Sequence, residues 1–311
     1  MSAQSLSRRS WPWRPWWRSL LAGLVCVLGL QSLPAQAAAP DLLRAQFDAL
    51  RAKAQGQLGD KPVYLQSSEV ADHMQGDVYA LIDQPYANLR QGLARAEPWC
   101  GVLILHLNVK YCRAVTGSAG QDELVAGVGR KFDQPLSSVY WVRFGFSLAS
   151  ASDSYFNAVL QAPSGPLSTR DYRIVLEAVP LSAGQTLLHM SYAYGYGTAA
   201  RWAMQAYLAT IGSDKRGFSV VGQGADGRPQ LVAGVRGVLE RNTLRYYLAI
   251  DAWLSARAQS EAELLPRSLQ LWFSATERFA QQLHEIEREA YVEMKLREAR
   301  RQQSVEPPAA K

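Results

Sequence analysis

The four histidines of the chain offer little metal or catalytic chemistry. His73, His106, His189 and His284 lie far apart, and none stands in the HExxH spacing or an equivalent one. The chain also lacks a CxxC pair and the GxSxG motif of a serine nucleophile. We therefore expect no metal site, no cofactor and no catalytic residue. His189 remains a candidate for orienting a ligand, with satisfaction by a neighbouring residue or by solvent as the alternative.

One glycine motif matches a phosphate-binding loop by its letters. Gly222, Gly224 and Gly227 in "GQGADG" satisfy GxGxxG. A dinucleotide site needs this loop to open a helix, because the helix N-terminus binds the pyrophosphate. Here the motif precedes Pro229 and a strand-like segment. We interpret it as a turn between two strands.

Arginines in strand-like segments are possible contacts for a charged group. Arg143, Arg173 and Arg245 are the three that we expect to project from central strands. An inward arginine needs a partner, and Asp251 or Glu177 are candidates. Without a protein partner, such a cation would favour an anionic head group, either a phosphate or a carboxylate. An outward arginine in a solvated ion pair is the alternative.

A row of tyrosines lies on the opposite parity from His189. Tyr192, Tyr194 and Tyr196 alternate along the segment "QTLLHMSYAYGYG". Tyrosine has an apolar body and a polar tip, which suits the mouth of a pocket. The same row would also suit an outer sheet face covered by a helix.

Two cysteines, Cys100 and Cys112, remain once an N-terminal leader is set aside. They stand in "WCGVLILHLNVKYC", and an exported protein meets an oxidising compartment in which a disulfide between them would form. Two buried free thiols are the alternative.

The elements that must position these residues follow a period of two over most of the chain. A turn-linked hairpin over 171–197 is the strongest signal, and "RNTLRYYLAIDAWL" at 241–254 is interpreted as the last strand because its apolar residues alternate. The predicted strands are 63–68, 76–82, 101–112, 123–132, 137–152, 154–162, 171–181, 185–197, 217–222, 230–239 and 241–254.

Helical spacing is confined to four regions. An amphipathic helix is predicted over 41–57 from Leu42, Leu43, Phe47 and Leu50, short helices over 83–100, and a further helix over 198–211. One long helix is predicted over 263–302. Helices that do not alternate with strands indicate an α+β fold.

The first 37 residues read as a signal peptide. Four arginines precede an apolar run, and "AQAAAP" offers a cleavage site after Ala37. We expect a periplasmic or secreted protein, with an inner-membrane protein anchored by an uncleaved leader as the alternative. Without the four leader arginines the formal charge of +6 falls to about +2, so the basic composition is no nucleic-acid signal.

The order of elements resembles the helix-grip fold of the START/Bet v 1-like (SRPBCC) superfamily. Two stretches carry the resemblance, "DVYALIDQPYANLRQGLARAEPWC" and "RYYLAIDAWLSARAQSEAELLPRSLQLWFSATERF". It implies a curved antiparallel sheet wrapped around a long C-terminal helix over 61–302. An N-terminal amphipathic helix at 38–58 would precede this domain, and a disordered tail at 303–311 would follow it.

The resemblance also implies an apolar cavity that binds or carries a hydrophobic ligand such as a lipid. Transient contact with a membrane surface is expected, and the oligomeric state stays open. The alternatives are an enzyme on the same scaffold, a cyclase or hydrolase, and an envelope structural protein with a filled core. The expected ligand-binding residues are Tyr140, Phe144, Phe146, His189, Tyr192, Tyr194, Arg245, Tyr247, Trp272 and Phe279.

Overall fold

The computed structural model of the chain describes residues 35–53, 56–59, 62–197, 202, 215–258 and 260–309, with side chains from residue 39 onward. These residues belong to one compact unit that runs from Gln36 to Lys311, apart from Ala35. The expected signal peptide lies outside the described residues except for its last positions, as does the helix predicted at 198–211 except for Trp202.

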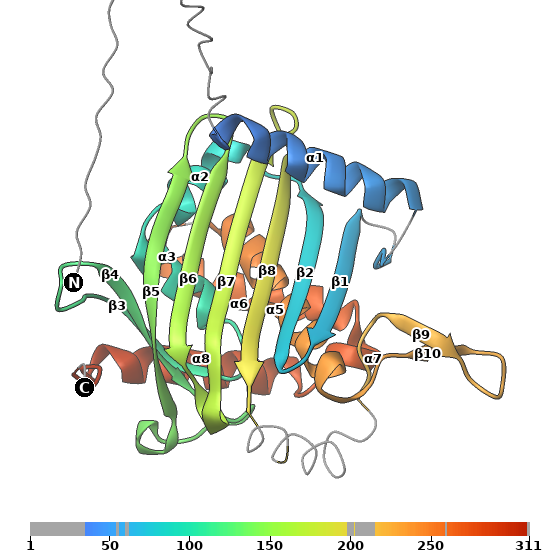
Figure 1. The fold of residues 1–311 in the computed structure, drawn as a ribbon. Helices are drawn as coiled ribbons and strands as arrows, with labels where there is room; N and C mark the ends of the chain where they lie inside the picture. The colour runs from blue at the N-terminus through green and yellow to red at the C-terminus, as the bar shows by residue number, and fades with distance from the viewer. Residues whose placement is uncertain are drawn as a thin grey trace, which may run out of the picture. The chain divides into compact units, whose positions relative to one another are not determined.

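An eight-stranded antiparallel sheet in the order β1-β2-β8-β7-β6-β5-β4-β3 forms the centre of the fold (Figure 1). Because β2 pairs with β8, the chain leaves the sheet after β2 and returns at the far edge. Two short helices, α2 (Tyr86–Leu93) and α3 (Ala96–Leu103), make that crossing. The strands are β1 (Val63–Val70), β2 (His73–Ile82), β3 (Val109–Thr116), β4 (Asp122–Val128), β5 (Tyr140–Ala151), β6 (Phe156–Ser164), β7 (Thr169–Pro180) and β8 (Thr186–Tyr196).

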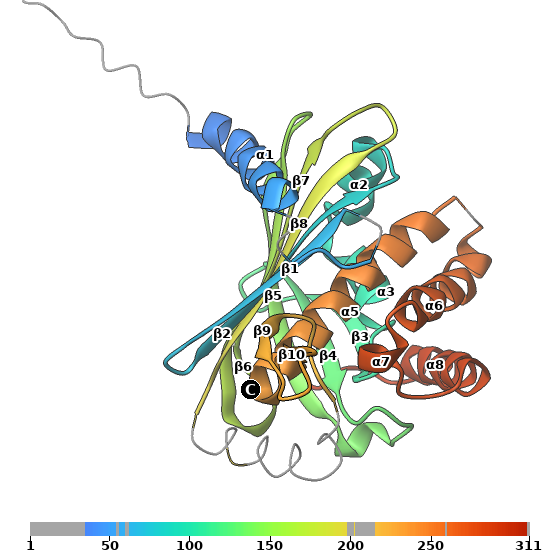
Figure 2. The ribbon, with the colours of Figure 1, turned by 90° about the vertical axis from the view of Figure 1, so that its right-hand side faces the viewer.

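One face of the sheet grips a helix. Helix α5 (Gly234–Ala256) packs mainly against β1, β2 and β8. Helices α6 (Glu261–Glu277), α7 (Ala280–Leu283) and α8 (Arg288–Gln303) lie on the same side of the sheet (Figure 2). The predicted α+β helix-grip class is therefore confirmed, and so is the β7–β8 hairpin.

The strand predicted at 241–254 is wrong, because these residues form the middle of α5. Leu244 and Leu248 are buried on one side of the helix and Trp253 is buried on the opposite side, and Tyr247 and Ile250 are buried as well. A helix packed between a sheet and other helices has apolar residues all round, which hides the period of 3.6 that identifies a half-exposed helix.

The single helix predicted at 263–302 is also wrong. The chain forms α6, then α7, then α8, with breaks at 278–279 and 284–287. The breaks let α8 fold back so that it packs on α6 and on the edge strand β3. The helix gripped by the sheet is consequently α5 and not the last helix of the chain.

The amphipathic helix predicted near the N-terminus is confirmed as α1 (Ala35–Lys53), and it covers the opposite face of the sheet (Figure 2). Leu43, Phe47 and Leu50 pack against a small apolar cluster there. The sheet residues of this cluster are Tyr64, Tyr155, Val179 and Leu187. Among the described residues no helix has the length and apolar character that crossing a membrane requires.

The strands predicted at 101–112 and 230–239 are both shorter in the structure, whereas "GQGADG" forms the predicted turn. The strand predicted from 101 begins only at Val109, because α3 continues to Leu103 and a turn follows. The "GQGADG" motif is the predicted turn, with Gly227 at φ +74° between β9 (Val220–Gln223) and β10 (Pro229–Leu231). The predicted strand at 230–239 stops at Leu231, since α5 begins at Gly234.

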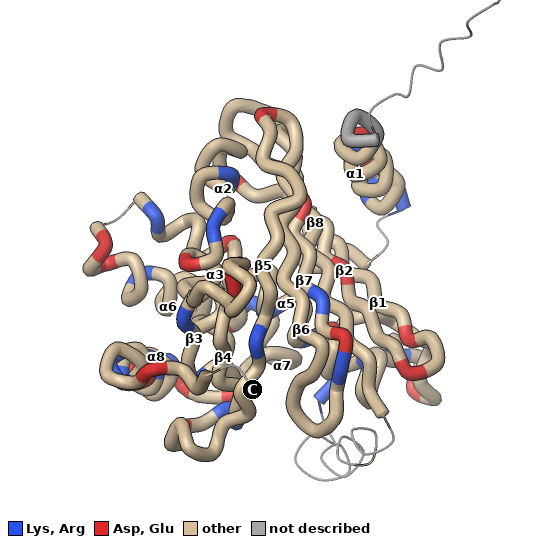
Figure 3. Tube along the Cα trace, turned by 60° about the vertical axis from the view of Figure 1, so that its left-hand side comes forward, with Lys and Arg blue, Asp and Glu red and all other residues tan. Residues whose placement is uncertain are grey.

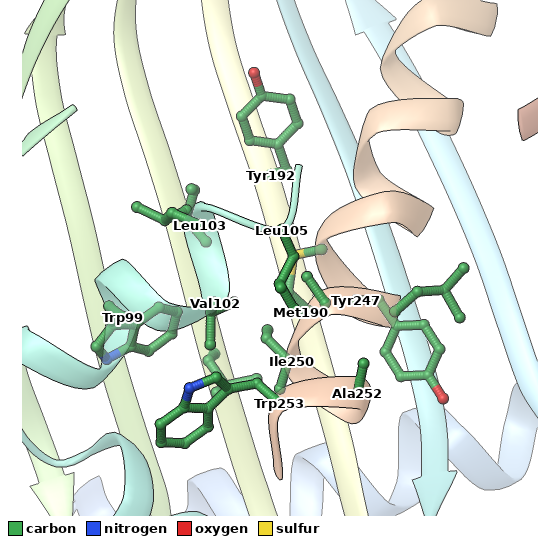
Figure 4. Close-up of a cluster of buried hydrophobic side chains, with 14 of the residues drawn as sticks. Trp99, Val102, Leu103, Leu105, Met190, Tyr192, Tyr247, Ile250, Ala252 and Trp253 are labelled. Carbon is green, nitrogen blue, oxygen red and sulfur yellow. The ribbon is translucent and has the colours of Figure 1, made fainter. Parts of the chain in front are cut away.

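Close approach between α5 and the sheet is possible at β2 because of a glycine. A Cβ atom built at Gly76 would lie 2.3 Å from the hydroxyl oxygen of Thr243 on α5. The core beside this contact joins side chains from α3, β8 and α5, among them Trp99, Met190 and Ile250 (Figure 4).

Buried charges attach α8 to the edge strand β3. Glu298 accepts hydrogen bonds from Lys110 at 2.9 Å and from Lys295 at 2.9 Å, and all three side chains are fully buried. Lys295 also donates to the carbonyl of Val109 at 2.7 Å. Burial lowers the pKa of Lys295 to about 8, an effect that the Glu298 carboxylate opposes.

Residues after α8 lie along the same strand, within the segment 303–311 for which a disordered tail is expected. The hydroxyl of Tyr111 donates to the carbonyl of Val305 at 3.0 Å, and Arg113 pairs with Glu306 at 2.5 Å. Arg143, for which an outward ion pair was the alternative to an inward position, pairs with Glu123 at 3.0 Å.

The disulfide between Cys100 and Cys112 is present and joins α3 to β3. It closes a loop with a sequence separation of 12. We predict that Cys112→Ser lowers the free energy of unfolding by about 2–3 kcal/mol, because the unfolded chain gains the freedom of that loop. Urea denaturation measures the change.

Cys100→Ser is the matched control and should cost a similar amount. Dithiothreitol should shift the wild-type unfolding curve to lower urea concentration. It should leave the curve of the variant with both Cys100→Ser and Cys112→Ser unchanged. An unshifted wild-type curve under full reduction would contradict the prediction.

Candidate functional site

A pocket of about 1260 Å³ lies between the inner face of the sheet and α5. Its apolar walls come from β3, β4, β5, β7, β8 and the residue at the end of α3. A pocket of this size exceeds the range typical of small-molecule sites, roughly 300–1,000 Å³. The apolar and aromatic lining includes Leu103, Val109, Ala126, Val128, Val142, Phe144, Tyr172, Ile174, Tyr192, Tyr246 and Ile286.

The rim of the pocket exposes large apolar side chains. Phe132 is 56% exposed, Tyr140 51% and Leu167 50%, and all three line the pocket. Leu167 and Ser168 both have left-handed backbone conformations, at φ +56° and +62°, in the turn between β6 and β7. Such strain in non-glycine residues concentrates at functional sites.

Aromatic rings form a continuous wall inside. Phe144 contacts Tyr172 edge-on at 6.4 Å between ring centroids, and Tyr172 lies 6.3 Å from Tyr192. Tyr192 lies 5.2 Å from Tyr246, whose ring stacks on His106 at 4.7 Å. This wall suits the flat or chain-like body of an apolar molecule.

His106 is a neutral member of that wall. The backbone N–H of Asn108 donates to its Nδ1 at 3.1 Å, which places the remaining proton on Nε2. Burial holds its pKa well below the usual 6.5, and the charges of Arg245, Lys295 and Lys131 lower it further.

Cations gather at one side of the pocket, where the Glu285 carboxylate also lies. Glu285 Oε1 accepts from Lys131 at 2.6 Å and from Arg245 at 2.8 Å. Arg241 lines the pocket one helical turn before Arg245 and donates to the carbonyl of Arg216 at 3.2 Å. These groups, which we call the cation cluster, are Lys131, Arg241 and Arg245.

The ionisation of Glu285 follows from these neighbours. Burial alone would raise its pKa, but the charges of Arg245 and Lys131 outweigh burial and hold the pKa below its ordinary value. The carboxylate is therefore ionised at neutral pH. Burial, together with the charge of Arg245, lowers the pKa of Lys131, while Glu285 opposes that shift.

A second, smaller pocket of about 510 Å³ lies on the other side of α5. Leu58, Val63 and Ile82 supply part of its apolar wall, and Asp251 and Arg278 are among its charged residues. It adjoins the end of α6 and is separate from the residues that line the larger pocket.

The expected ligand-binding residues divide among several places. Tyr140, Phe144, Tyr192 and Arg245 line the large pocket, and Tyr247 and Phe279 line the small one. The others line neither. Tyr194 stacks on Tyr172 at 5.4 Å, and Phe146 packs against the core. Trp272 is buried, donates to the carbonyl of Arg245 at 3.0 Å and stacks on Tyr291.

His189 lies on the opposite face of the sheet from the large pocket. Its Nδ1 is 2.7 Å from Glu177 and its Nε2 is 2.9 Å from Asp77, and its ring stacks on Tyr79 at 4.2 Å. Tyr155 donates to Glu177 in the same cluster. The alternation along β8 sends His189 outward and Tyr192 inward, so they cannot share one site.

Several pocket residues were not singled out from the sequence. Lys131 and Phe132 lie beyond the end of β4 at Val128, although a strand was predicted over 123–132. Glu285 lies in a break of the helix predicted over 263–302, and Arg241 and Tyr246 lie in α5, part of which was interpreted as a strand. An exposed phenylalanine between charges in "GRKFDQP" was the one available signal for the rim. No group of three or more His, Cys, Asp or Glu side chains among the described residues is arranged to hold a metal ion.

Acidic and basic residues are interspersed along the described trace (Figure 3). Near the pocket rim, Asp133 pairs with Arg301 at 3.0 Å and with Arg297 at 3.7 Å, and both partners belong to α8. The loop 129–139 at the rim is therefore tied to the C-terminal helix by charge.

Comparison with known proteins gives matches to solved structures only. A Streptomyces sp. R1128 aromatase/cyclase matches at 10% identity and a TM-score of 0.35, over 63% of this chain and 98% of that one. Human StAR-related lipid transfer protein 5 matches at 8% identity and 0.34, over 56% and 88%. Ara h 8.0201 matches at 8% and 0.34, over 62% and 99%.

At such identities and TM-scores the likeness assigns neither a ligand nor an activity to this chain. No protein-family model and no curated protein matches the chain.

The outer-face histidine gives a pH prediction. Burial alone would lower the pKa of His189, but Asp77 and Glu177 raise it from 6.5 to about 9. The resulting stabilisation, up to about 3 kcal/mol, is complete below pH 6.5 and is lost as pH rises through 9. We expect His189→Gln to remove this alkaline loss in urea titrations between pH 6 and 10.

The exposed His73→Gln is the control and should keep the wild-type profile. Parallel pH profiles for His189→Gln and wild type would contradict a charged His189 in the folded protein.

Proposed function

We propose that the protein binds an apolar small molecule in the large pocket. The observation that carries this proposal is the pocket itself: about 1260 Å³ with an aromatic and aliphatic wall between the sheet and α5. Side chains do not fill this space, and removing apolar ligand surface from water would contribute about 25 cal/mol per Å².

Entry would occur at the rim. Phe132, Tyr140 and Leu167 are exposed apolar side chains from two separate segments, and an apolar ligand would pass between them. The same side chains, with Arg130 above the ring of Phe132, suit brief contact with a membrane surface from which such a ligand is taken.

The alternatives have weaker support. A solid core conflicts with the volume of the pocket. An enzyme built on His189 would need that residue beside the ligand, and it lies on the other face of the sheet between two carboxylates. Ligand binding therefore has the best support.

We also propose that the protein acts outside the cytoplasm. The basic and apolar leader with its cleavage site after Ala37 supports export, and so does the Cys100–Cys112 disulfide, because such bonds persist in oxidising compartments.

Filling the pocket tests the proposed function. Val142 lines the pocket from β5 and is 3% exposed, so Val142→Trp should occupy ligand space. We expect the dissociation constant for N-phenyl-1-naphthylamine, a neutral fluorescent probe, to rise about tenfold or more. Fluorescence titration measures it.

Val175→Trp, on the outer face of β7, is the matched control and should leave probe affinity unchanged. Thermal unfolding of both variants checks that they are folded. Equal probe affinity for Val142→Trp and wild type would remove the support for this pocket as the binding site.

A second measurement addresses natural occupancy. Native mass spectrometry of protein purified from its own envelope should detect a bound apolar molecule that organic extraction releases. Only apo protein, with no mass shift after lipid is added, would count against ligand binding.

A further inference from the structure

We propose that the ligand of the large pocket carries an anionic oxyacid group, a carboxylate or a phosphate, which replaces the Glu285 carboxylate between Lys131 and Arg245. This inference rests on the proposed function, since it assigns the head-group chemistry of a ligand held in that pocket.

The geometry begins with one oxygen atom that serves two cations. Glu285 Oε1 lies 2.6 Å from Lys131 Nζ and 2.8 Å from an Arg245 guanidinium nitrogen. Arg241 lines the same side of the pocket from the preceding turn of α5. An oxyacid group has two or more acceptor oxygens, and an arginine fork binds such groups in bidentate geometry.

The cations of α5 are held in place by the fold. Arg245 is 1% exposed and donates to the carbonyl of Leu283 at 3.1 Å as well as to Glu285. Arg241 is 2% exposed and is anchored through the carbonyl of Arg216. Both sit in the middle of a 23-residue helix, so the positive side of the pocket is rigid.

The carboxylate comes from a segment without regular secondary structure, unlike the two arginines. Glu285 lies in the irregular segment 284–287 between α7 and α8, and its side chain retains some exposure. Exchange of Glu285 for a ligand anion would keep at least one negative charge beside the cation cluster. The buried cations would therefore keep a counterion throughout binding, which avoids the cost of leaving them without one.

The apolar wall adjoins the cation cluster within one pocket. Tyr246 follows Arg245 in α5, and Ile286 follows Glu285, and both line the pocket beside Tyr192 and Phe144. A molecule with an anionic group and an apolar body would satisfy both parts at once. An amine would meet the cation cluster with like charge, and a neutral alcohol would leave Glu285 in place.

Isothermal titration of the full mature chain with matched twelve-carbon probes tests the inference. Dodecanoate and dodecyl phosphate should bind about tenfold or more tightly than dodecanol, because charge-assisted hydrogen bonds distinguish them. Inorganic phosphate alone should bind far more weakly, since it lacks the apolar body.

Removing the internal carboxylate gives a signature that a structural role would not. Glu285→Gln should tighten dodecanoate binding about tenfold and leave dodecanol binding unchanged, because the competing anion is gone. Lys131→Met should weaken dodecanoate binding alone. Glu277→Gln, which lies outside the pocket and contacts His284, is the matched control and should change neither.

The outcomes separate the two proposals. Equal affinity for dodecanoate and dodecanol overturns the head-group inference and leaves the proposed function standing. Absence of binding by all three amphiphiles overturns both. If inorganic phosphate binds as tightly as dodecyl phosphate, the claim that the ligand needs an apolar body is wrong. If Glu285→Gln binds dodecanoate more weakly than wild type does, the claim that the ligand anion replaces Glu285 is wrong.

Discussion

The contact between α5 and the sheet is the constraint on which the rest of the structure depends. The helix approaches β2 closely because Gly76 leaves room for Thr243. On the same helix Glu240 is fully buried and accepts from the backbone N–H groups of Phe218 and Ser219, at 2.6 and 3.0 Å. One helix thereby fixes the sheet on one side, and it orders the chain that precedes it.

The pocket is a consequence of where that helix lies. Helix α5 packs mainly on β1, β2 and β8, while the larger pocket is lined from β3, β4 and β5 at the other side of the sheet. A sheet of this width cannot be covered by a single helix about 10 Å across. The uncovered part is filled by α3 near Trp99 and by the pocket beyond it. The residues that α5 turns toward that space are Val238, Arg241, Asn242, Arg245 and Tyr246.

Most of the fold class could be predicted from the sequence, because strands with one buried face keep a period of two. The pattern fails where an element is buried on both sides. Because α5 is buried on several faces, as Tyr247 and Trp253 show, its apolar residues also alternate along 241–254 and so matched a strand. The site was predicted only in part. Tyr140, Phe144 and Tyr192 follow from strand parity, whereas Lys131 and Glu285 meet through loops whose path no local pattern contains.

The capped edge strand β3 has a consequence for how copies of this protein can meet. Backbone groups on the outer side of β3 already have hydrogen-bond partners. The N–H of Cys112 donates to the side chain of Gln302 at 3.1 Å, and the carbonyl of Val109 accepts from Lys295. The residues after α8 lie alongside the strand. Sheet-to-sheet addition therefore has no template on this side. Removing residues 302–309 would expose these backbone groups and uncover that template.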